Sequence, residues 1–209
     1  EDFYRFFPFS RSNQNKLYLY QVRFFELLFS ITGIAIGALM VPFLVVANWF
    51  WNRGPLFYTQ ERVGKDGALF KIYKFRSMVE NAEANGAVFS KIGDTRVTPF
   101  GKFLRKTRID EIPQFLNILK GDMGVIGPRP ERPMFVEEIS AIMPFYETRH
   151  IIKPGLTGWA QVNYNYGESI EESLVKLQYD LYYIKHRSVF IDISIVFKTI
   201  STVVFYRGQ

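Results

Sequence analysis

The chain has 209 residues, of which 48% are hydrophobic and 17% aromatic, and it carries a net charge of +6. That length suffices for one compact core, and the positive charge suits anionic lipids or phosphorylated substrates. The absence of cysteine excludes disulfides, thiolate metal sites and a cysteine nucleophile, and the two histidines, His150 and His186, are too far apart in sequence to favour a histidine metal site. The chain has no zinc-finger spacing, RNA-recognition signature or long basic run, so we expect no nucleic-acid partner.

An uncharged run extends from Leu27 to Trp51 and is long enough to enter a bilayer, which about 20 apolar residues suffice to cross. Pro42 removes a helical hydrogen bond inside this run and favours a bend there. Basic residues flank the run on both sides, and cationic flanks prefer the cytoplasmic side. A re-entrant helix-break-helix satisfies that preference at both ends, whereas a single span violates it at one. We therefore predict three parts: an interfacial N-terminal segment 1–22, a re-entrant anchor 23–52 broken near Pro42, and a cytosolic domain 53–209 with interfacial C-terminal helices. Residues 1–15 show no signal-peptide pattern.

A β-hairpin is expected next, because aromatic and β-branched residues over 56–63 and 68–78 flank a glycine-rich turn. Helices are then expected over 98–106, 112–120, 132–143, 171–186 and 190–206, from apolar residues at helical spacing and from stop signals such as Gly121 and Pro144. The last of these is almost uncharged, so we expect it to be buried or to lie in the membrane interface. Together the elements predict an α+β fold that is mainly helical and membrane-associated, with a re-entrant anchor and a small hairpin.

Two adjacent carboxylates, Asp110 and Glu111, stand in a segment rich in arginine. Carboxylate oxygens suit Mg²⁺, which keeps several waters for substrate phosphates to displace. Arg105 precedes the pair and Arg129 follows it in a proline-stiffened turn, and guanidinium groups grip phosphate oxygens through paired hydrogen bonds. The same pattern also fits a solvated helix start, where the helix dipole would keep an acid ionised and ready to act as ligand or nucleophile. Both interpretations can hold together.

Seven short blocks occur in order between residues 74 and 184, within a resemblance that covers about residues 23–208. They are KFRSM at 74–78, FLRKT at 103–107, DEIPQ at 110–114, KGDM at 120–123, GPRP at 127–130, KPGLTGWAQVN at 153–163 and DLYYI at 180–184. In these blocks and their spacing the chain resembles the bacterial sugar transferases that are monotopic phosphoglycosyl transferases, the enzymes that initiate surface-polysaccharide and glycoconjugate assembly.

The resemblance implies transfer of a phospho-sugar from a nucleotide sugar, usually a UDP-sugar, to a polyprenol phosphate such as undecaprenyl phosphate, with release of UMP. It implies that Asp110 is a covalent nucleophile and that Glu111 helps to bind Mg²⁺ and handles protons. It also implies a place at the bacterial inner membrane, in contact with membrane lipids, with the catalytic domain facing the cytoplasm. The candidate substrate-binding residues are Lys74, Arg76, Arg105, Gln114, Pro128, Arg129 and Pro130.

Three features depart from the shorter relatives. Arg108 stands where many relatives carry serine, and an added cation there is expected to shift the grip on the sugar donor or the ionisation of the dyad. The stretch 163–167 also differs and is a candidate for selectivity toward that donor. Glu1 in place of a methionine suits the longer members, which carry extra N-terminal membrane helices.

Two other classes of function stay open on the sequence. One is a membrane-attached assembly scaffold that binds anionic lipid without turnover. The other is a metal-dependent phosphodiesterase or nuclease that uses the same acidic dyad. The second lacks the spread of metal-binding acids and histidines that a two-metal hydrolase normally shows.

Overall fold

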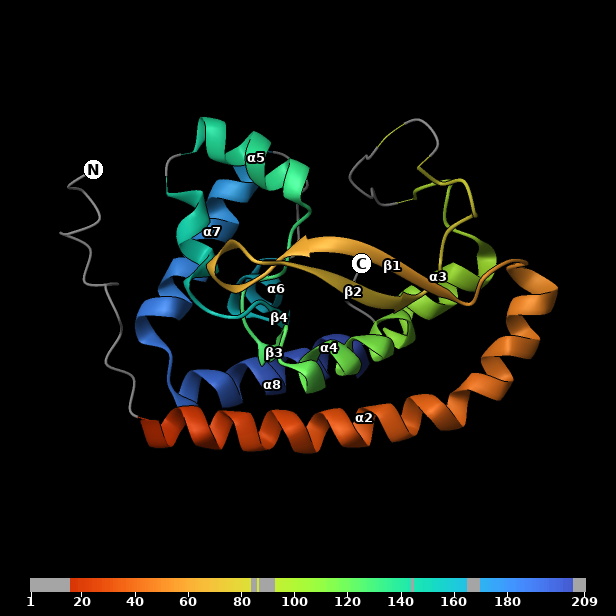
Figure 1. Cartoon of the computed structure of the whole chain (residues 1–209), viewed down its shortest axis with the longest axis horizontal. Coiled ribbons are helices and arrows are strands. Elements are labelled where there is room, and N and C mark those ends of the chain that lie inside the picture. Colours follow the sequence, from red (N-terminus) through yellow and green to blue (C-terminus); the bar gives the residue numbers. More distant parts are fainter. Residues whose placement is uncertain (1–15, 84–85, 87–92, 144, 165–169, 205–209) are drawn as a thin grey trace.

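The computed structural model describes residues 16–83, 86, 93–143, 145–164 and 170–204. Most of them lie in helices, and a two-stranded antiparallel hairpin crosses the middle of the molecule (Figure 1). The helices are α2 (Lys16–Trp51), α3 (Pro99–Lys106), α4 (Phe115–Lys120), α5 (Pro133–Ile142), α6 (Trp159–Asn163), α7 (Ile170–His186) and α8 (Val189–Val204), and the 3₁₀ turns are η1 (Lys65–Gly67), η2 (Ile109–Gln114) and η3 (Tyr146–Ile151). The strands are β1 (Phe57–Val63), β2 (Leu69–Phe75), β3 (Gly124–Ile126) and β4 (Gly155–Thr157).

The elements expected from the sequence are mostly confirmed. The hairpin and the helices near 98–106, 132–143, 171–186 and 190–206 are found in place. The helix expected over 112–120 is divided, because the 3₁₀ turn η2 occupies its first residues and α4 begins only at Phe115. The parallel pair β3–β4 was not predicted, since strands of three residues show no periodicity. Residues 1–15 and residues 165–167 of the expected selectivity stretch lie outside the described residues.

The longest element is α2, a helix of 36 residues that contains Pro42. It runs along the base of the molecule and bends toward its C-terminal end (Figure 1). The structure differs here from the expected break, because α2 stays helical through Pro42 and begins at Lys16 rather than near residue 23. A proline inside a helix removes one hydrogen bond and crowds the preceding turn, which bends a helix without necessarily ending it.

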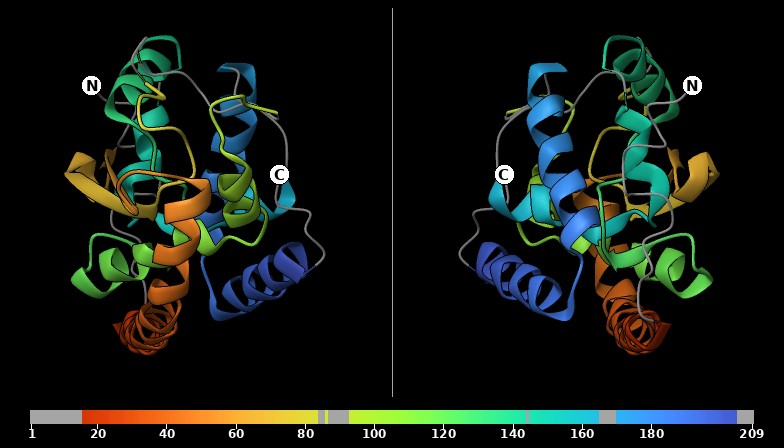
Figure 2. Two further views of the ribbon diagram at one scale, coloured as in Figure 1. Left: turned by 90° about the vertical axis from the view of Figure 1, so that its right-hand side faces the viewer. Right: turned by 90° about the vertical axis from the view of Figure 1, so that its left-hand side faces the viewer.

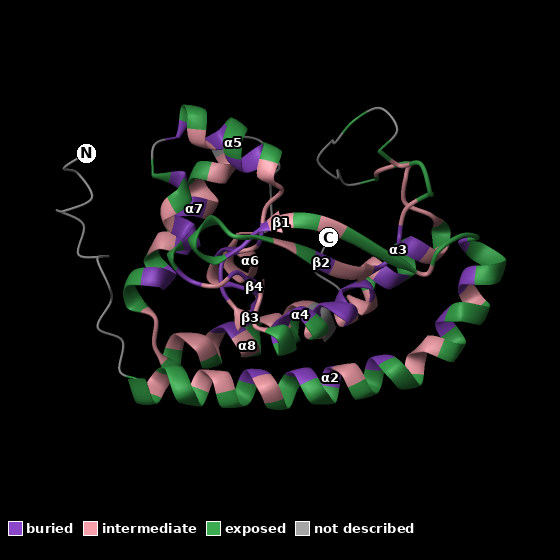
Figure 3. Ribbon diagram, viewed as in Figure 1, coloured by how far each residue is buried: buried purple, intermediate pink, exposed green. Residues whose placement is uncertain are grey.

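The two faces of α2 differ sharply in composition. The buried face carries mostly small or polar residues at helical spacing, namely Glu26, Ser30, Gly33, Gly37 and Asn48, together with the apolar Leu44. The exposed face is apolar, and its most exposed members are Tyr20, Phe24, Leu39, Phe43, Trp49, Phe50 and Trp51 (Figure 3). Among the described helices, α2 is the one long and apolar enough to cross a membrane by length and composition, and 22% of its most apolar stretch is buried.

Both ends of α2 are attached to the same folded body. Near its start, Arg23 donates to the carbonyls of Ile118 and Leu119 at 2.8 and 2.9 Å, and so caps the C-terminus of α4. Just past its end, Asn52 Nδ2 donates to the Arg76 carbonyl at 2.8 Å. Between these points a Cβ on Gly33 would lie 2.3 Å from the Phe115 ring, so the glycine permits close packing. The helix therefore lies along the domain rather than projecting from it.

A buried asparagine fixes α4 against the hairpin. Asn117 has no exposed surface, its Nδ2 donates to the Lys71 carbonyl at 2.7 Å, and its Oδ1 accepts from the Tyr73 amide at 3.1 Å. Both polar groups of the Asn117 side chain are thus hydrogen-bonded to the backbone of β2, as buried polar groups require. Since η2 leads directly into α4, the same contacts set the position of η2 beside β2.

Three glycines bring the backbones of β3 and β4 together. A Cβ on Gly127 would lie 2.4 Å from the Lys153 carbonyl, one on Gly155 would lie 2.1 Å from the Gly127 nitrogen, and one on Gly158 would lie 2.1 Å from the Gly127 carbonyl. The parallel pairing of Gly124 with Gly155 continues this contact. The GPRP and KPGLTG blocks therefore form one rigid backbone unit, because no side chain separates them.

Helix α8 adds a second apolar surface at the base of the molecule (Figure 2). Its exposed side chains Phe190, Ile193, Phe197 and Ile200 recur at helical spacing and form one stripe. Asp192 joins α8 to two other helices, since it accepts from Tyr18 of α2 at 2.5 Å and from Tyr183 of α7 at 2.7 Å. The exposed stripe fits the interfacial position expected for this helix.

Candidate active site

Strand β2 delivers Lys74 to the acidic dyad. Lys74 Nζ lies 3.3 Å from Glu111 Oε1, and this pair is largely buried. Phe75, the next residue, points to the other side and packs into an apolar cluster with Leu44 and Leu104. Alternation along a strand places successive side chains on opposite faces, so one residue supplies charge to the site while its neighbour supplies support.

The end of the KFRSM block is structural in its contacts. Arg76 donates all of its described hydrogen bonds to backbone carbonyls, those of Asn52, Arg53, Pro55 and Met78. These bonds tie the end of α2 to the end of β2, and they favour a structural role over the substrate-binding role expected from the sequence. Ser77 Oγ accepts from Arg105 Nε at 2.9 Å, so it orients an arginine that was predicted to bind phosphate.

The dyad lies in η2, and both carboxyl groups are buried. Asp110 is 6% exposed and Glu111 is 8% exposed. Glu111 is surrounded by cations: besides Lys74, Arg129 Nη1 lies 3.4 Å from Oε1 and Arg108 Nη1 lies 3.5 Å from Oε2. Asp110 Oδ1 is buried and has no hydrogen-bond partner among the described residues. Glu111 therefore has three cations beside it, whereas one oxygen of the neighbouring Asp110 has no hydrogen-bond partner among the described residues.

The ionisation of the two acids follows from these environments. Burial, and then the charge of Glu111, raises the pKa of Asp110 to about 6, although Lys74, Arg105 and Arg108 oppose this rise. Burial also acts to raise the pKa of Glu111, but Lys74, Arg129 and Arg108 outweigh it and hold that pKa at about 2. Desolvation raises the pKa of Asp110 and so makes its carboxylate a stronger base than an ordinary aspartate. This differs from the expectation that a helix dipole would favour the ionised form.

The remaining predicted residues surround the dyad at different depths. Gln114, on the same turn, is 3% exposed, and its Nε2 has no hydrogen-bond partner among the described residues. Pro128 and Pro130 are buried and flank Arg129, whose side chain is 41% exposed. The structure thus brings Lys74, Arg105, Arg129 and Gln114 around the dyad, with the two prolines as backbone support.

A buried ion pair between Arg149 and Asp180 holds the backbone of Arg129, and the sequence did not predict it. Arg149 donates to Asp180 Oδ2 from Nε at 3.0 Å and from Nη2 at 2.8 Å, and to the Tyr146 hydroxyl from Nη1 at 2.7 Å. Nη2 also donates to the Arg129 carbonyl at 2.9 Å. The DLYYI block contained Asp180 as a signal, but nothing in the sequence paired it with Arg149. An ion pair this deep fixes a geometry more than it adds stability.

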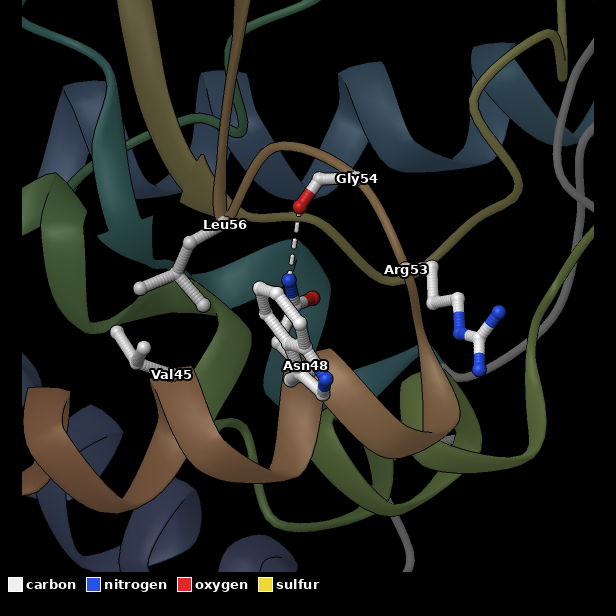
Figure 4. A pocket seen from close by; sticks show the side chains of 6 residues that line it. Val45, Asn48, Arg53, Gly54 and Leu56 are labelled. Atoms are coloured by element: carbon white, nitrogen blue, oxygen red, sulfur yellow. Dashed lines mark hydrogen bonds between the residues drawn. The ribbon is translucent and has the colours of Figure 1, made fainter.

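A hollow of about 620 Å³ lies at the C-terminal end of α2 and is lined by Val45, Asn48, Trp49, Arg53, Gly54 and Leu56 (Figure 4). Asn48 Nδ2 donates to the Gly54 carbonyl at 2.8 Å beside it. No predicted site residue lines it. Leu56 also packs into the apolar cluster that includes Ile109 and Ile112, so the hollow adjoins the support of the dyad.

The donor set fits a phosphate-bound divalent cation with few protein ligands. In the part of the chain that the structure describes, no three His, Cys, Asp or Glu side chains gather into a metal-binding cluster. Mg²⁺ commonly takes one or two carboxylates and completes its shell with water and substrate phosphate. The buried, unpaired Asp110 Oδ1 suits this role, whereas both oxygens of Glu111 already lie beside cations.

Comparison with known proteins identifies the family of the chain. The family model described as Bacterial sugar transferase matches residues 17–206. The chain is a member of the bacterial sugar transferase family. The match runs from α2 through α8, so this bacterial sugar transferase shares with its family both the apolar helix and the dyad-bearing domain.

Individual relatives differ in the sugar that they carry. An Aeromonas hydrophila protein named UDP-N-acetylgalactosamine-undecaprenyl-phosphate N-acetylgalactosaminephosphotransferase is 45% identical over 187 residues, which is 90% of this bacterial sugar transferase and 44% of the relative. A UDP-glucose:undecaprenyl-phosphate glucose-1-phosphate transferase of Escherichia coli is 42% identical over 151 residues, which is 71% of this chain and 32% of the relative. A putative undecaprenyl-phosphate N-acetylgalactosaminyl 1-phosphate transferase of Bacillus subtilis is 46% identical over 141 residues, 68% of this chain and 79% of the relative. The chain thus spans less than half of the first and second of these relatives.

Proposed function

We propose that this bacterial sugar transferase moves a phospho-sugar from a UDP-sugar to undecaprenyl phosphate, or a similar polyprenol phosphate, and releases UMP. The observation that carries the proposal is a buried Asp110, whose Oδ1 has no hydrogen-bond partner among the described residues, next to a Glu111 held ionised by three cations. Relatives named as undecaprenyl-phosphate sugar phosphotransferases support the same reaction class.

In the first step, a carboxylate oxygen of Asp110 attacks the β-phosphorus of the sugar donor. The bond from that phosphorus to the bridging oxygen breaks, UMP leaves with the electron pair, and the phospho-sugar remains on Asp110 as an acyl phosphate. A raised pKa makes Asp110 a better nucleophile than an ordinary aspartate, while it stays mostly ionised at neutral pH.

In the second step, an oxygen of the lipid phosphate attacks the same phosphorus. The bond to Asp110 breaks, which restores the carboxylate and yields a polyprenyl-diphosphate-sugar. Arg105 and Arg129 would hold phosphoryl oxygens in both steps, and the proline-flanked backbone of Arg129 limits its movement. Glu111 keeps Lys74, Arg108 and Arg129 gathered at the site and so shapes the positive potential around the reacting phosphorus.

Mg²⁺ would be held by Asp110, with a smaller contribution from Glu111, and would neutralise phosphate charge when bound. The residues themselves perform the other tasks: Asp110 forms the covalent bond, and the arginines and Lys74 orient the two anionic substrates. Two sequential displacements at one carboxylate give ping-pong kinetics.

We also propose that α2 is a re-entrant anchor that keeps the site at the cytoplasmic face of the inner membrane. Its apolar face would enter the lipid, and each such side chain removed from water contributes about 1.5–3 kcal/mol. The attachment of both ends of α2 to one body, through Arg23 and Asn52, supports a helix that returns to the side it entered from. Basic residues at both ends support the same topology.

The reaction is tested by incubating the protein with Mg²⁺, undecaprenyl phosphate and single UDP-sugars, including UDP-N-acetylgalactosamine and UDP-glucose, and measuring UMP. We expect UMP release with one sugar donor, and without acceptor a burst of about one UMP per active site with a phospho-sugar mass added to Asp110. Continuous hydrolysis without the acceptor would indicate a phosphodiesterase, and lipid binding without UMP would indicate a scaffold.

The topology is tested with single cysteines at Lys16 and Lys65, since the chain has none of its own. A membrane-impermeant thiol reagent should label neither site in intact cells and both in permeabilised cells. Labelling of one site alone in intact cells would establish a full span and overturn the re-entrant anchor.

A further inference from the structure

The backbone of Arg108 has a conformation that arginine rarely adopts. Its φ of 58° and ψ of 14° lie in the left-handed region, directly after Thr107, the C-cap of α3. Helices often end this way, but glycine or asparagine usually occupies the left-handed position because a Cβ is crowded there. The Arg108 amide donates to the Arg105 carbonyl at 3.1 Å, a bond that any residue can make. The turn therefore does not need arginine, and the cost of placing one there points to its side chain.

The side chain of Arg108 approaches the dyad at the second oxygen of Glu111. Its Nη1 lies 3.5 Å from Glu111 Oε2, and the side chain is 36% exposed. Lys74 and Arg129 both face the other oxygen, Oε1, at 3.3 and 3.4 Å. Tight charge-assisted hydrogen bonds measure about 2.7–2.9 Å, so none of the three cations is closely bound to Glu111. A phosphate oxygen can therefore compete with Glu111 for the partly exposed Arg108 guanidinium, while Lys74 and Arg129 remain beside Glu111.

The charge of the site favours that exchange. Four basic side chains, Lys74, Arg105, Arg108 and Arg129, act on the two carboxyl groups of the dyad. Basic side chains therefore outnumber acidic ones at the site, which favours the anionic diphosphate of a nucleotide sugar. Arg108 lies two residues before Asp110, on the turn that carries the nucleophile.

We propose that Arg108 binds the β-phosphoryl group of the sugar donor, and that it moves to this group from Glu111 when the donor enters. This inference rests on the proposed function, since it assigns a residue to the diphosphate that Asp110 would attack. A fork-shaped guanidinium suits that task better than a lysine ammonium. The side chain lies beside Glu111 Oε2, whereas Lys74 and Arg129 lie beside Oε1.

The test compares UDP-sugar with UMP as ligands of an enzyme that cannot turn over. In the Asp110→Asn background, Arg108→Asn should weaken UDP-sugar binding by about 10-fold or more, the scale of a lost charge-assisted contact, and should change UMP binding little. Asparagine tolerates the left-handed backbone, which offsets the lost contact with Glu111, so the melting temperature should change by no more than a few degrees. Arg108→Lys should recover only part of the affinity.

Lys106→Asn is the matched control, because it removes an exposed cation two residues away on the same segment. It should leave UDP-sugar binding within about twofold of the parent, as expected for a screened surface charge. Equal losses of UDP-sugar affinity in Arg108→Asn and Lys106→Asn would show that any nearby positive charge has this effect, and would overturn the specific contact of Arg108. A lowered melting temperature with unchanged UDP-sugar binding would make Arg108 a structural partner of Glu111 and overturn the proposal.

The binding measurement also separates this inference from the reaction proposed above. Suppose that the chain with Asp110 intact releases UMP, and that Arg108→Asn in the Asp110→Asn background keeps its full affinity for UDP-sugar. The role proposed for Arg108 is then wrong, and the proposed transfer is unaffected. If the parent chain releases no UMP but UDP-sugar binding still depends on Arg108, the contact stands and the reaction does not.

Discussion

Helix α2 and turn η2 deviate from an ordinary soluble domain in opposite ways. Along α2, large apolar side chains such as Phe43 and Trp49 are exposed, and the buried face is mostly small or polar. In η2, two carboxyl groups are buried, and Ile109 and Ile112 pack into the adjoining apolar cluster. Exposed apolar surface and buried charge both cost stability in water. We propose that lipid covers the exposed face of α2 and that the cations gathered around η2 bind a substrate phosphate.

Asp110→Asn should give the largest effect, because it removes the nucleophile. We expect UMP release to fall by about 10³-fold or more. The same substitution should raise the melting temperature at pH 7.5: the folded pKa of about 6 lies above the unfolded value of 3.8, so ionised Asp110 costs stability above pH 6 and the cost disappears as the pH falls toward 4. Thermal unfolding at pH 7.5 and pH 4 checks both signs.

Glu111→Gln is the partner of that experiment and should have the opposite effect on stability. The folded pKa of Glu111, about 2, lies below its usual 4.5, so its charge stabilises the fold above pH 4.5 and this contribution is lost as the pH falls toward 2. We expect the variant to melt lower than the parent at pH 7.5. Equal shifts for both variants would remove the contrast between the two acids.

Arg129→Lys and Arg105→Lys should follow, with losses on the order of 10- to 100-fold in kcat/KM, since about 1.5–3 kcal/mol attaches to a hydrogen bond with a charged group. Arg129 should be the more sensitive, because two prolines and the Arg149 bond limit its adjustment. Arg132→Lys is the control: Arg132 makes a two-pronged contact with Glu83 at 3.0 Å, three residues from Arg129, and its loss should leave turnover near the parent value.

The pH dependence of the first step should report Asp110. In single turnovers without acceptor, the rate of the UMP burst should fall about tenfold per pH unit below pH 6, because a protonated Asp110 cannot attack. His150 does not explain such a limb, since burial and Arg149 lower its pKa to about 4. His186→Gln should keep the same profile, and a shift of the limb in that variant would assign it to histidine instead.

The smallest effect on turnover should come from the buried face of α2. Gly33→Leu forces a side chain into the Phe115 ring and should destabilise the protein by about 1–3 kcal/mol, the usual cost of overpacking. Ala35→Leu adds the same side chain on the exposed face and should melt like the parent in detergent. Melting curves of the two variants compare the faces directly, and equal stability would contradict the packing of α2 against α4.

The sequence predicted most of what depends on local pattern. The apolar run, the hairpin and the long helices follow from spacing and composition, and the acidic pair stands out because charge is dense around it. The continuity of α2 through Pro42 was missed, because packing against α4 and the ends held by Arg23 and Asn52 outweigh one lost hydrogen bond. Local preference cannot report such tertiary support.

Within the site, the resemblance assigned different roles to Asp110 and Glu111, but the sequence did not predict how their surroundings differ. Only the three-dimensional arrangement shows three cations beside Glu111 and an Asp110 oxygen without a hydrogen-bond partner among the described residues. Arg149 and its pairing with Asp180 were missed because the residues are 31 positions apart and meet only in the fold. Arg76 was expected at the substrate for its charge alone, whereas its contacts are with backbone carbonyls.

The contact between Gly127, Gly155 and Gly158 leaves the turn that presents Arg129 with no side chain to repack. Substitutions elsewhere on the surface can therefore accumulate without displacing Arg129, which we propose to bind phosphate. A change in the sugar of the donor would then require no change in the backbone that presents this arginine.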